Sequence, residues 1–156
     1  MAFVDYSVGV GEEGKEKFPY IYNVSFSVGF AGISCRDDVM LVQYLLKKIW
    51  ERSYHPPPDG TMLVDGWMGP ITDRWIRRFQ KGDAFDVPEP GLMLQDGIVD
   101  SARGSTYASN TGLCWSIVYM NVRFKYTYPE LYDRLPTAPD LPPLLAHSLA
   151  TNIDFG

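Results

Sequence analysis

The chain has 156 residues, of which 46% are hydrophobic and 21% are charged, so it can bury one sizeable core and form a single compact domain with elaborations. Its formal net charge of -5 argues against a nucleic-acid partner, which would require a strongly basic surface. No run of residues is long and apolar enough to span a bilayer, so no membrane partner is expected.

Residues 1 to 32 are predicted to form an N-terminal β-hairpin. Strands over 3 to 10 and 18 to 30 flank a charged, glycine-rich turn at 11 to 17. In the second strand apolar residues occupy every second position, as in a strand with one buried face: Tyr20, Tyr22, Val24, Phe26, Val28 and Phe30. A two-stranded hairpin is marginal in water, so either the rest of the chain or another subunit must cover this face.

A helix is predicted over residues 37 to 53, with Ser34 or Asp37 as its N-cap. Its acidic start and basic end suit the helix dipole. Helical spacing predicts a buried stripe made of Val39, Val42, Leu46 and either Ile49 or Trp50. A loop with three consecutive prolines at 56 to 58 follows this helix.

A glycine-punctuated turn at 64 to 69 leads directly into a second predicted helix. Asp65-Gly66 is a tight-turn signal, and Pro70 suits the first position of a helix, which should end near Gly82. Helical spacing predicts an apolar face made of Ile71, Trp75, Ile76 and Phe79. The opposite face carries one acidic residue and a basic strip: Asp73, Arg74, Arg77, Arg78 and Lys81.

The remaining half of the chain gives weaker signals. Residues 83 to 104 are rich in Pro, Gly and Asp and are predicted to be irregular. Residues 105 to 126 fit the spacing of either a helix or a strand. Residues 126 to 156 are predicted to form a C-terminal extension with two short helices, one opened by Pro129 and the other capped by Asp140.

Residues 37 to 82 resemble the repeat of the peptidoglycan-binding-like domain family. That repeat reads Leu-Gln and a short helix, then Asp-Gly-x-x-Gly-x-x-Thr and Val-x-x-Phe-Gln. The matching positions here are Val42, Gln43, Leu46, Asp65, Gly66, Gly69, Thr72, Phe79 and Gln80. Trp75 departs from the pattern, because the family usually carries a small residue there, normally Ala.

A weaker echo of the repeat at 96 to 122 starts with a second Asp-Gly pair, at 96 and 97. In the family a third helix follows such a turn, so the resemblance favours a helix over 111 to 122. We therefore expect an α+β fold, in which a small helical bundle of the peptidoglycan-binding-like type spans 33 to 125. The β-hairpin at 1 to 32 precedes this bundle, and the helical extension at 126 to 156 follows it.

The resemblance implies a ligand surface on the Asp-Gly turn and the helix after it, with peptidoglycan as a partner. The candidate ligand-binding residues are Asp65, Gly66, Trp67, Thr72, Arg74, Arg78 and Gln80. Trp67 could stack on a sugar ring or anchor a partner protein, and the basic strip could contact a stem-peptide carboxylate or a teichoic phosphate. Alternatively, Trp67 caps the core and the strip is a solvated helix face with local ion pairs.

No catalytic constellation is evident, so we predict a protein that is not an enzyme and that has no catalytic residue, metal site or cofactor. The only histidines are His55 and His147, whereas a zinc site needs about three protein ligands. A cysteine nucleophile needs an adjacent base, and neither Cys35 nor Cys114 has a neighbouring histidine in the sequence. The two cysteines could form one disulfide, although a lone pair is more often two buried thiols.

Two functions therefore fit the sequence. The chain could be a non-catalytic module that recognises peptidoglycan, or a purely structural, self-assembling protein that uses the same fold as a scaffold and binds no glycan. The first residues lack the features of a signal peptide, so synthesis in the cytoplasm is expected. A phage or injection-type particle reconciles both functions, because such a particle assembles in the cytoplasm and meets the wall later. The partners of the chain would then be other copies of the chain or other particle proteins.

Overall fold

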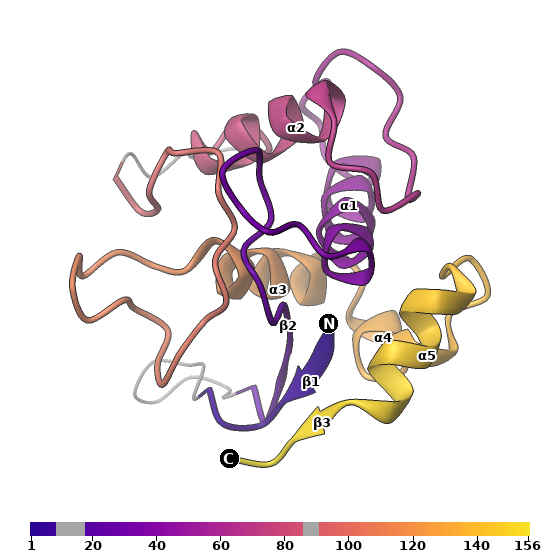
Figure 1. Ribbon diagram of the computed structural model, residues 1–156. Helices are drawn as coiled ribbons and strands as arrows, with labels where there is room; N and C mark the ends of the chain where they lie inside the picture. The colour runs from indigo at the N-terminus through magenta and orange to yellow at the C-terminus, as the bar shows by residue number, and fades with distance from the viewer. Residues whose placement is uncertain (9–17, 86–90) are drawn as a thin grey trace.

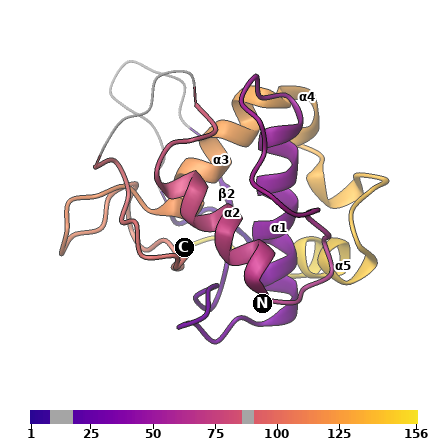
Figure 2. The same cartoon turned by 90° about the horizontal axis from the view of Figure 1, so that it is seen from above.

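The computed structural model describes residues 1–8, 18–85 and 91–156 and confirms the predicted α+β class (Figure 1). Its helices are α1 (Arg36–Glu51), α2 (Pro70–Gln80), α3 (Ser116–Thr127), α4 (Pro129–Tyr132), the 3-10 helix η1 (Leu135–Thr137) and α5 (Pro143–Thr151). Its strands are β1 (Phe3–Asp5), β2 (Ile21–Asn23) and β3 (Ile153–Asp154). Figure 2 shows α2 and α5 on opposite sides of α1.

A small sheet joins the two ends of the chain, with the strand order β2-β1-β3. β1 pairs antiparallel with β2, with Phe3 opposite Asn23, and parallel with β3, with Val4 opposite Ile153. The predicted pairing of the first two strands is therefore present, but both are much shorter than 3 to 10 and 18 to 30. The turn predicted at 11 to 17 lies outside the described residues, and the sequence did not predict β3.

The buried side chain of Asn23 explains why β2 ends early. Its Oδ1 accepts the backbone N–H groups of Val24 and Ala102, and its Nδ2 donates to Asp5 Oδ2, so the side chain replaces ladder hydrogen bonds. Beyond β2, Phe26 and Phe30 are 46% and 59% exposed. The alternating apolar residues from 20 to 30 therefore do not form one strand, because the regular strand does not continue past Asn23. The prediction of a strand over 18 to 30 is wrong in its extent.

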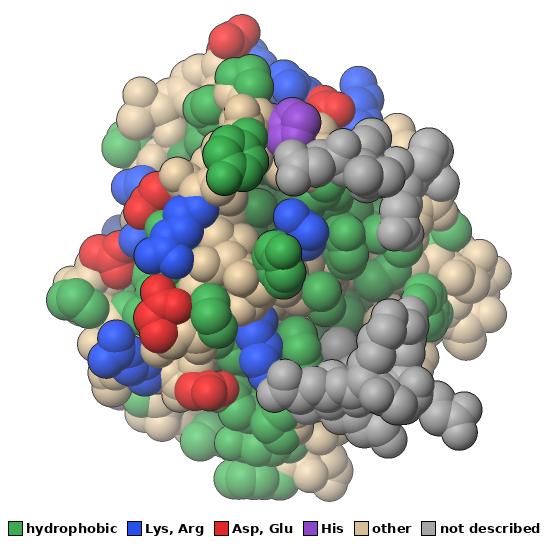
Figure 3. Space-filling model, turned by 180° about the vertical axis from the view of Figure 1, so that it is seen from behind, with side chains coloured by type: hydrophobic (Ala, Val, Ile, Leu, Met, Phe, Trp, Pro, Cys, Tyr) green, Lys and Arg blue, Asp and Glu red, His purple; other side chains and the backbone are tan. Residues whose placement is uncertain are grey.

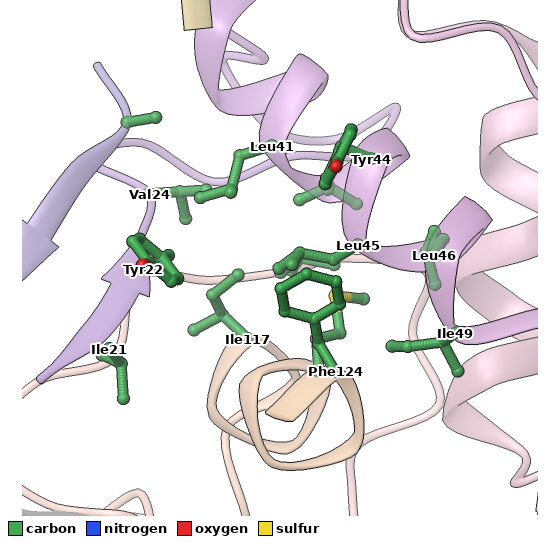
Figure 4. Close-up of a cluster of buried hydrophobic side chains, with 14 of the residues drawn as sticks. Ile21, Tyr22, Val24, Leu41, Tyr44, Leu45, Leu46, Ile49, Ile117 and Phe124 are labelled. Atoms are coloured by element: carbon green, nitrogen blue, oxygen red, sulfur yellow. The ribbon is translucent and has the colours of Figure 1, made fainter. Parts of the chain in front are cut away.

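The hydrophobic core lies between α1, α3 and β2, and side chains from all three predicted segments contribute to it. Figure 4 shows Leu41 and Leu45 of α1 converging with Ile117 and Phe124 of α3 and with Tyr22 of β2. The predicted stripe of α1 is buried in full: Val39, Val42, Leu46, Ile49 and Trp50. Burial of each such side chain contributes about 1.5–3 kcal/mol, so this core holds the helices and the sheet together.

Helix α2 begins at Pro70 and is followed by Gly82 in the left-handed conformation (φ +86°), as predicted. Trp75 is buried against α1. Its ring meets that of Trp50 edge to face, with centroids 5.3 Å apart. Ile71, on the predicted apolar face, is 38% exposed and lies against Gly60 of the preceding loop.

Helix α3 occupies 116 to 127, about five residues later than the predicted 111 to 122. An isolated antiparallel bridge between Tyr107 and Cys114 precedes the helix and encloses a turn in which Gly112 adopts a φ of +72°. The chain becomes helical only after Trp115, the N-cap residue. The choice of helix over strand was therefore right, and its start was wrong.

The caps predicted for α1 and α5 are wrong. The N-cap residues are Cys35 and Pro142, and neither helix has a side-chain hydrogen bond at its N-cap. Ser34 instead bonds within its own loop, where its hydroxyl donates to the carbonyl oxygen of Gly29.

Aspartates that looked like caps instead fasten the C-terminal extension to α1. Asp37 Oδ2 accepts a hydrogen bond from Ser148 Oγ at 2.7 Å. Asp140 accepts one from Tyr44 Oη at 2.8 Å and pairs with Lys48 Nζ at 2.6 Å. Burial by itself raises the pKa of Asp140, but the bonds from Lys48 and Tyr44 outweigh it, so this pKa lies below its ordinary value.

We predict that Asp140→Asn lowers the free energy of unfolding at pH 7 and has a smaller effect at acidic pH. Because the folded state lowers the pKa of Asp140, its contribution is present above the unfolded value near 3.8 and disappears as the pH falls through the folded value. Asp140 is half exposed, so the loss at pH 7 should be about 1 kcal/mol or less. Urea unfolding at both pH values measures it, with the exposed Asp59→Asn as control. An equal loss at both pH values would contradict the role of the ion pair.

Candidate functional site

The predicted Asp-Gly turn is held by a buried amide of α1, in an arrangement that we call the first glutamine clamp: Gln43, Asp65, Gly66, Trp67 and Thr72. Gln43 Oε1 accepts the N–H of Gly66 at 2.9 Å. Gln43 Nε2 lies 3.0 Å from both the Trp67 carbonyl oxygen and Thr72 Oγ1, and 3.1 Å from Asp65 Oδ1. The clamp therefore provides hydrogen-bond partners for the polar groups of the turn and fixes the start of α2.

The same arrangement recurs at the second Asp-Gly pair, in what we call the second glutamine clamp: Gln80, Asp96, Gly97, Ile98 and Ser116. Gln80 Oε1 accepts the N–H of Gly97 at 2.9 Å, and Gln80 Nε2 donates to the Ile98 carbonyl oxygen at 2.9 Å and to Ser116 Oγ at 3.1 Å. Asp96 Oδ1 accepts the N–H of Ile98, as Asp65 Oδ1 does for Trp67. The echo in the sequence thus corresponds to a repeated structure, in which a helix holds the turn before the next helix.

Each clamp needs glycine at the second position of its turn. Gly66 and Gly97 adopt φ values of +78° and +75°, which L side chains rarely adopt. A Cβ at Gly66 would also lie 2.9 Å from the backbone oxygen of Arg36. At Gly97 it would meet the guanidinium of Arg77, which is the flexible end of a side chain. The first turn is therefore the more tightly enclosed of the two.

The clamps contain five of the seven candidate ligand-binding residues, and Trp67 takes part only through its backbone. Asp65, Gly66 and Thr72 lie together in the first clamp, whereas Gln80 belongs to the second clamp. Thr72 and Gln80 are only 4% and 3% exposed, and their polar groups bond within the protein. Both therefore build the fold and are not available to a ligand from solvent.

Trp67 remains a candidate for binding. Its side chain is 68% exposed and its ring lies over Gly69, where an added Cβ would come within 2.8 Å of the ring. The alternative, that Trp67 caps the core, is wrong, because most of its surface is in solvent. A flat, exposed indole held against the backbone is suited to stacking on a ligand.

The basic strip of α2 is largely occupied by local contacts. Arg77 pairs with Asp73 at 3.1 Å, one turn earlier, and Arg78 pairs with Asp83. Arg74 donates to the Asp59 carbonyl oxygen at 3.0 Å. The face of the molecule opposite to the view of Figure 1 likewise shows basic and acidic side chains intermingled (Figure 3). These contacts favour the solvated, ion-paired alternative for the strip.

A pocket of about 420 Å³ lies beside the second clamp, and the sequence did not predict it. Its walls come from segments 25 to 33, 94 to 103 and 108 to 116, which pass close to one another in Figure 1. Charged and aromatic residues of these walls are Asp96, Asp100, Arg103, Phe26 and Trp115. The second Asp-Gly pair, at 96 and 97, lies in one of these walls. No pattern in the sequence indicated that this wall contacts the loop before α1.

Backbone hydrogen bonds fix the walls of the pocket. Val28 and Val99 exchange N–H···O bonds of 2.9 and 2.8 Å, which join the loop before α1 to the segment after α2. Ser27 Oγ donates to Asp100 Oδ1 across the same junction. Cys114 N–H donates to the Leu92 carbonyl oxygen at 2.9 Å on the far side. These bonds hold the three wall segments in place relative to one another.

The two cysteines are free thiols in different places. Cys35 is partly exposed at the start of α1, and Cys114 is buried in the pocket wall. Burial raises the pKa of the Cys114 thiol to about 12, so it is protonated at neutral pH. A protonated thiol is a poor nucleophile and a poor metal ligand.

The described residues contain neither a candidate metal site nor a candidate membrane span. Across 1–8, 18–85 and 91–156, no group of three or more His, Cys, Asp or Glu residues is placed to hold a metal ion. No helix in these ranges has the length and apolar character needed to cross a bilayer.

Comparison with protein-family models, curated proteins and solved structures finds no match to this chain.

We predict that Gly66→Ala destabilises the protein more than Gly104→Ala. Both glycines have positive φ (+78° and +76°), so alanine costs about 1–2 kcal/mol of backbone strain at either site. Only at Gly66 would the new Cβ also press on backbone, which should cost about 1–3 kcal/mol more. Urea unfolding of both variants measures the difference. Equal losses would show that the first turn is less enclosed than its geometry indicates.

We predict that iodoacetamide alkylates Cys35 at least roughly tenfold faster than Cys114 in the folded protein at about pH 8. Cys114 is buried and its raised pKa leaves very little thiolate, whereas Cys35 is partly exposed. Mass spectrometry of the alkylated peptides over time gives both rates. In denaturing urea the two rates should become similar, and a fast Cys114 in the folded protein would contradict its burial.

Proposed function

We propose that the chain is a non-catalytic recognition module for cell-wall peptidoglycan. The observation that carries the proposal is the repeated glutamine clamp: Gln43 and Gln80 hold two equivalent Asp-Gly turns. All residues of the first clamp except Trp67 are among those that carry the resemblance to the peptidoglycan-binding-like family. Because a fold can host several functions, the resemblance alone does not support peptidoglycan binding, and a surface that could receive a ligand is also required.

Each clamp borders such a surface. Trp67, in the first turn, offers an exposed indole face, and the second turn forms one wall of the pocket through Asp96 and Ile98. A wall polymer presents sugar rings with apolar faces and peptides with charged groups, so an aromatic platform and a charged pocket are complementary to it. Both surfaces lie next to turns that the clamps hold rigid.

Catalysis is not part of the proposed function. The thiol in the pocket wall is held protonated by burial. Each pocket aspartate uses one carboxylate oxygen to accept a hydrogen bond from the protein itself, Asp96 from the Ile98 N–H and Asp100 from Ser27. These groups suit binding and orientation better than attack on a bond.

A structural role in assembly is the second candidate, and one observation favours it. Tyr6 and Phe155 stack beside the sheet with ring centroids 5.3 Å apart, and both are exposed, at 42% and 76%. Ile153 of β3 is a further exposed apolar residue in the same segment. Exposed aromatic residues are enriched in protein interfaces, so other copies of the chain or other particle proteins could pack there. A phage or injection-type particle would accommodate both roles.

We predict that the protein is retained by insoluble peptidoglycan and that Trp67→Ala weakens this retention by roughly tenfold. The indole is the largest exposed side chain of the first turn, so its loss removes a stacking surface without opening the core. A sedimentation assay at low and high salt measures the bound fraction, and Tyr54→Ala, which removes a 94% exposed ring elsewhere, is the control.

Three outcomes would count against the proposal. Absence of retention of the wild type would contradict peptidoglycan recognition. If that absence came with oligomers that form at high concentration and dissociate in Phe155→Ser, the assembly role would replace it. Release of soluble wall fragments would contradict the absence of catalysis.

A further inference from the structure

We infer that the pocket beside the second glutamine clamp binds a zwitterionic α-amino acid group carried on an aliphatic chain. Such a group bears an ammonium and a carboxylate on one carbon atom. The inference deepens the proposed function, and it rests on that function only for the source of the group, which is the free end of a diamino-acid side chain in a wall peptide. The wall formed by 25 to 33 lies outside the residues that resemble the family.

Charges of both signs line the pocket without pairing to one another. Among the described residues, salt bridges join Arg77 to Asp73 and Arg78 to Asp83, but none involves Asp96, Asp100 or Arg103. Lone charged groups that share one pocket are available to a ligand. Two of them suit a cationic group and the third suits an anionic group.

Each of the two pocket carboxylates keeps one oxygen open. Asp96 Oδ1 accepts the Ile98 N–H, and Asp100 Oδ1 accepts from Ser27 Oγ, so each carboxylate is oriented through one oxygen. Within the described part of the chain, the Oδ2 atoms of both accept no hydrogen bond. An ammonium has three donors and no acceptor, which matches a pair of open carboxylate oxygens.

The set of charges favours a zwitterion over simpler ligands. A dicarboxylate or a phosphate would meet two carboxylates and only one cation, Arg103, and would be repelled. A plain amine would leave the Arg103 guanidinium without an anion. A neutral sugar would offer only dipoles to all three charges, and hydrogen bonds between charged partners are roughly twice as strong as neutral ones. A zwitterion pairs with both signs.

The apolar part of the walls suits the aliphatic chain. Leu94 and Ile33 are 45% and 70% exposed, and with Phe26 and Trp115 they line the same pocket. These side chains can contact the methylene groups that tether the charged end. The volume of about 420 Å³ lies within the range of about 300–1,000 Å³ that is typical of small-molecule sites.

The fixed walls make this pairing effective. The Val28–Val99 bridge and the second clamp hold the segments that carry Asp96 and Asp100 in place. A preformed site loses less conformational entropy on binding than one that must order itself.

Three probes of similar chain length separate the contribution of the ammonium groups from that of the carboxylates. 2,6-Diaminopimelate carries two zwitterionic ends, pimelate lacks the ammonium groups, and 1,5-diaminopentane lacks the carboxylates. By isothermal titration calorimetry, we expect diaminopimelate to bind roughly tenfold or more tightly than either of the others. Pimelate or diaminopentane binding as tightly as diaminopimelate would overturn the inference.

Variants of the pocket charges test the residues. Arg103→Gln and Asp100→Asn should each weaken diaminopimelate binding by roughly tenfold, while Arg134→Gln, an exposed arginine outside the pocket, should not change it. Circular dichroism checks that each variant folds, which is expected because Arg103 is exposed. Unchanged binding in both folded pocket variants would overturn the assignment of the site.

The source of the group is tested with insoluble peptidoglycan that contains diaminopimelate. Loss of both probe binding and wall retention in Arg103→Gln supports the wall peptide as the source. Loss of probe binding with unchanged wall retention overturns that source and identifies a free amino acid as the ligand. Wild-type wall retention without any preference for diaminopimelate overturns the inference alone, whereas absent wild-type retention overturns the proposed function alone.

Discussion

The buried primary amide of a glutamine is the interaction on which the arrangement of the three long helices depends. A tight turn exposes a backbone N–H and a C=O that need partners, and a carboxamide supplies one acceptor and two donors within a few ångströms. Gln43 of α1 holds the turn before α2, and Gln80 at the end of α2 holds the turn before α3. Each helix therefore positions the next. Leaving such buried groups unpaired would cost about 1–3 kcal/mol per group.

The two clamps differ in the length of chain between the turn and the clamp hydroxyl, and this difference creates the pocket. After Gly66, the chain reaches the clamp hydroxyl of Thr72 almost at once. After Gly97, a long segment intervenes before the equivalent hydroxyl of Ser116. That segment pairs with the loop before α1 at Val99 and encloses the pocket. A repeated element thus gives a rigid frame in which only the second copy carries an inserted wall.

The sequence predicted the parts of the fold that local chemistry determines. Pro70, Gly82 and helical spacing define α2, and the apolar stripe defines α1, because these signals act within a few residues. The extent of β2 could not be predicted, since Asn23 bonds to Ala102 far along the chain. The start of α3 could not be predicted either, since Cys114 pairs with Tyr107 and bonds to Leu92 before the helix begins. The candidate site divides in the same way: the Asp-Gly turn was visible, whereas the pocket depends on long-range pairing.

The charges of the chain show the same division between local pattern and tertiary structure. The sequence singled out the basic strip of α2 because its residues share a helix face, yet that same proximity lets Asp73 and Asp83 neutralise Arg77 and Arg78. Arg103 belongs to no such pattern and forms no ion pair with the described residues. A charge that is isolated in sequence and exposed at a pocket keeps its capacity to bind a ligand. In this protein the unpaired charges beside the second clamp, and not the strip on α2, are therefore the groups that keep their capacity for an external partner.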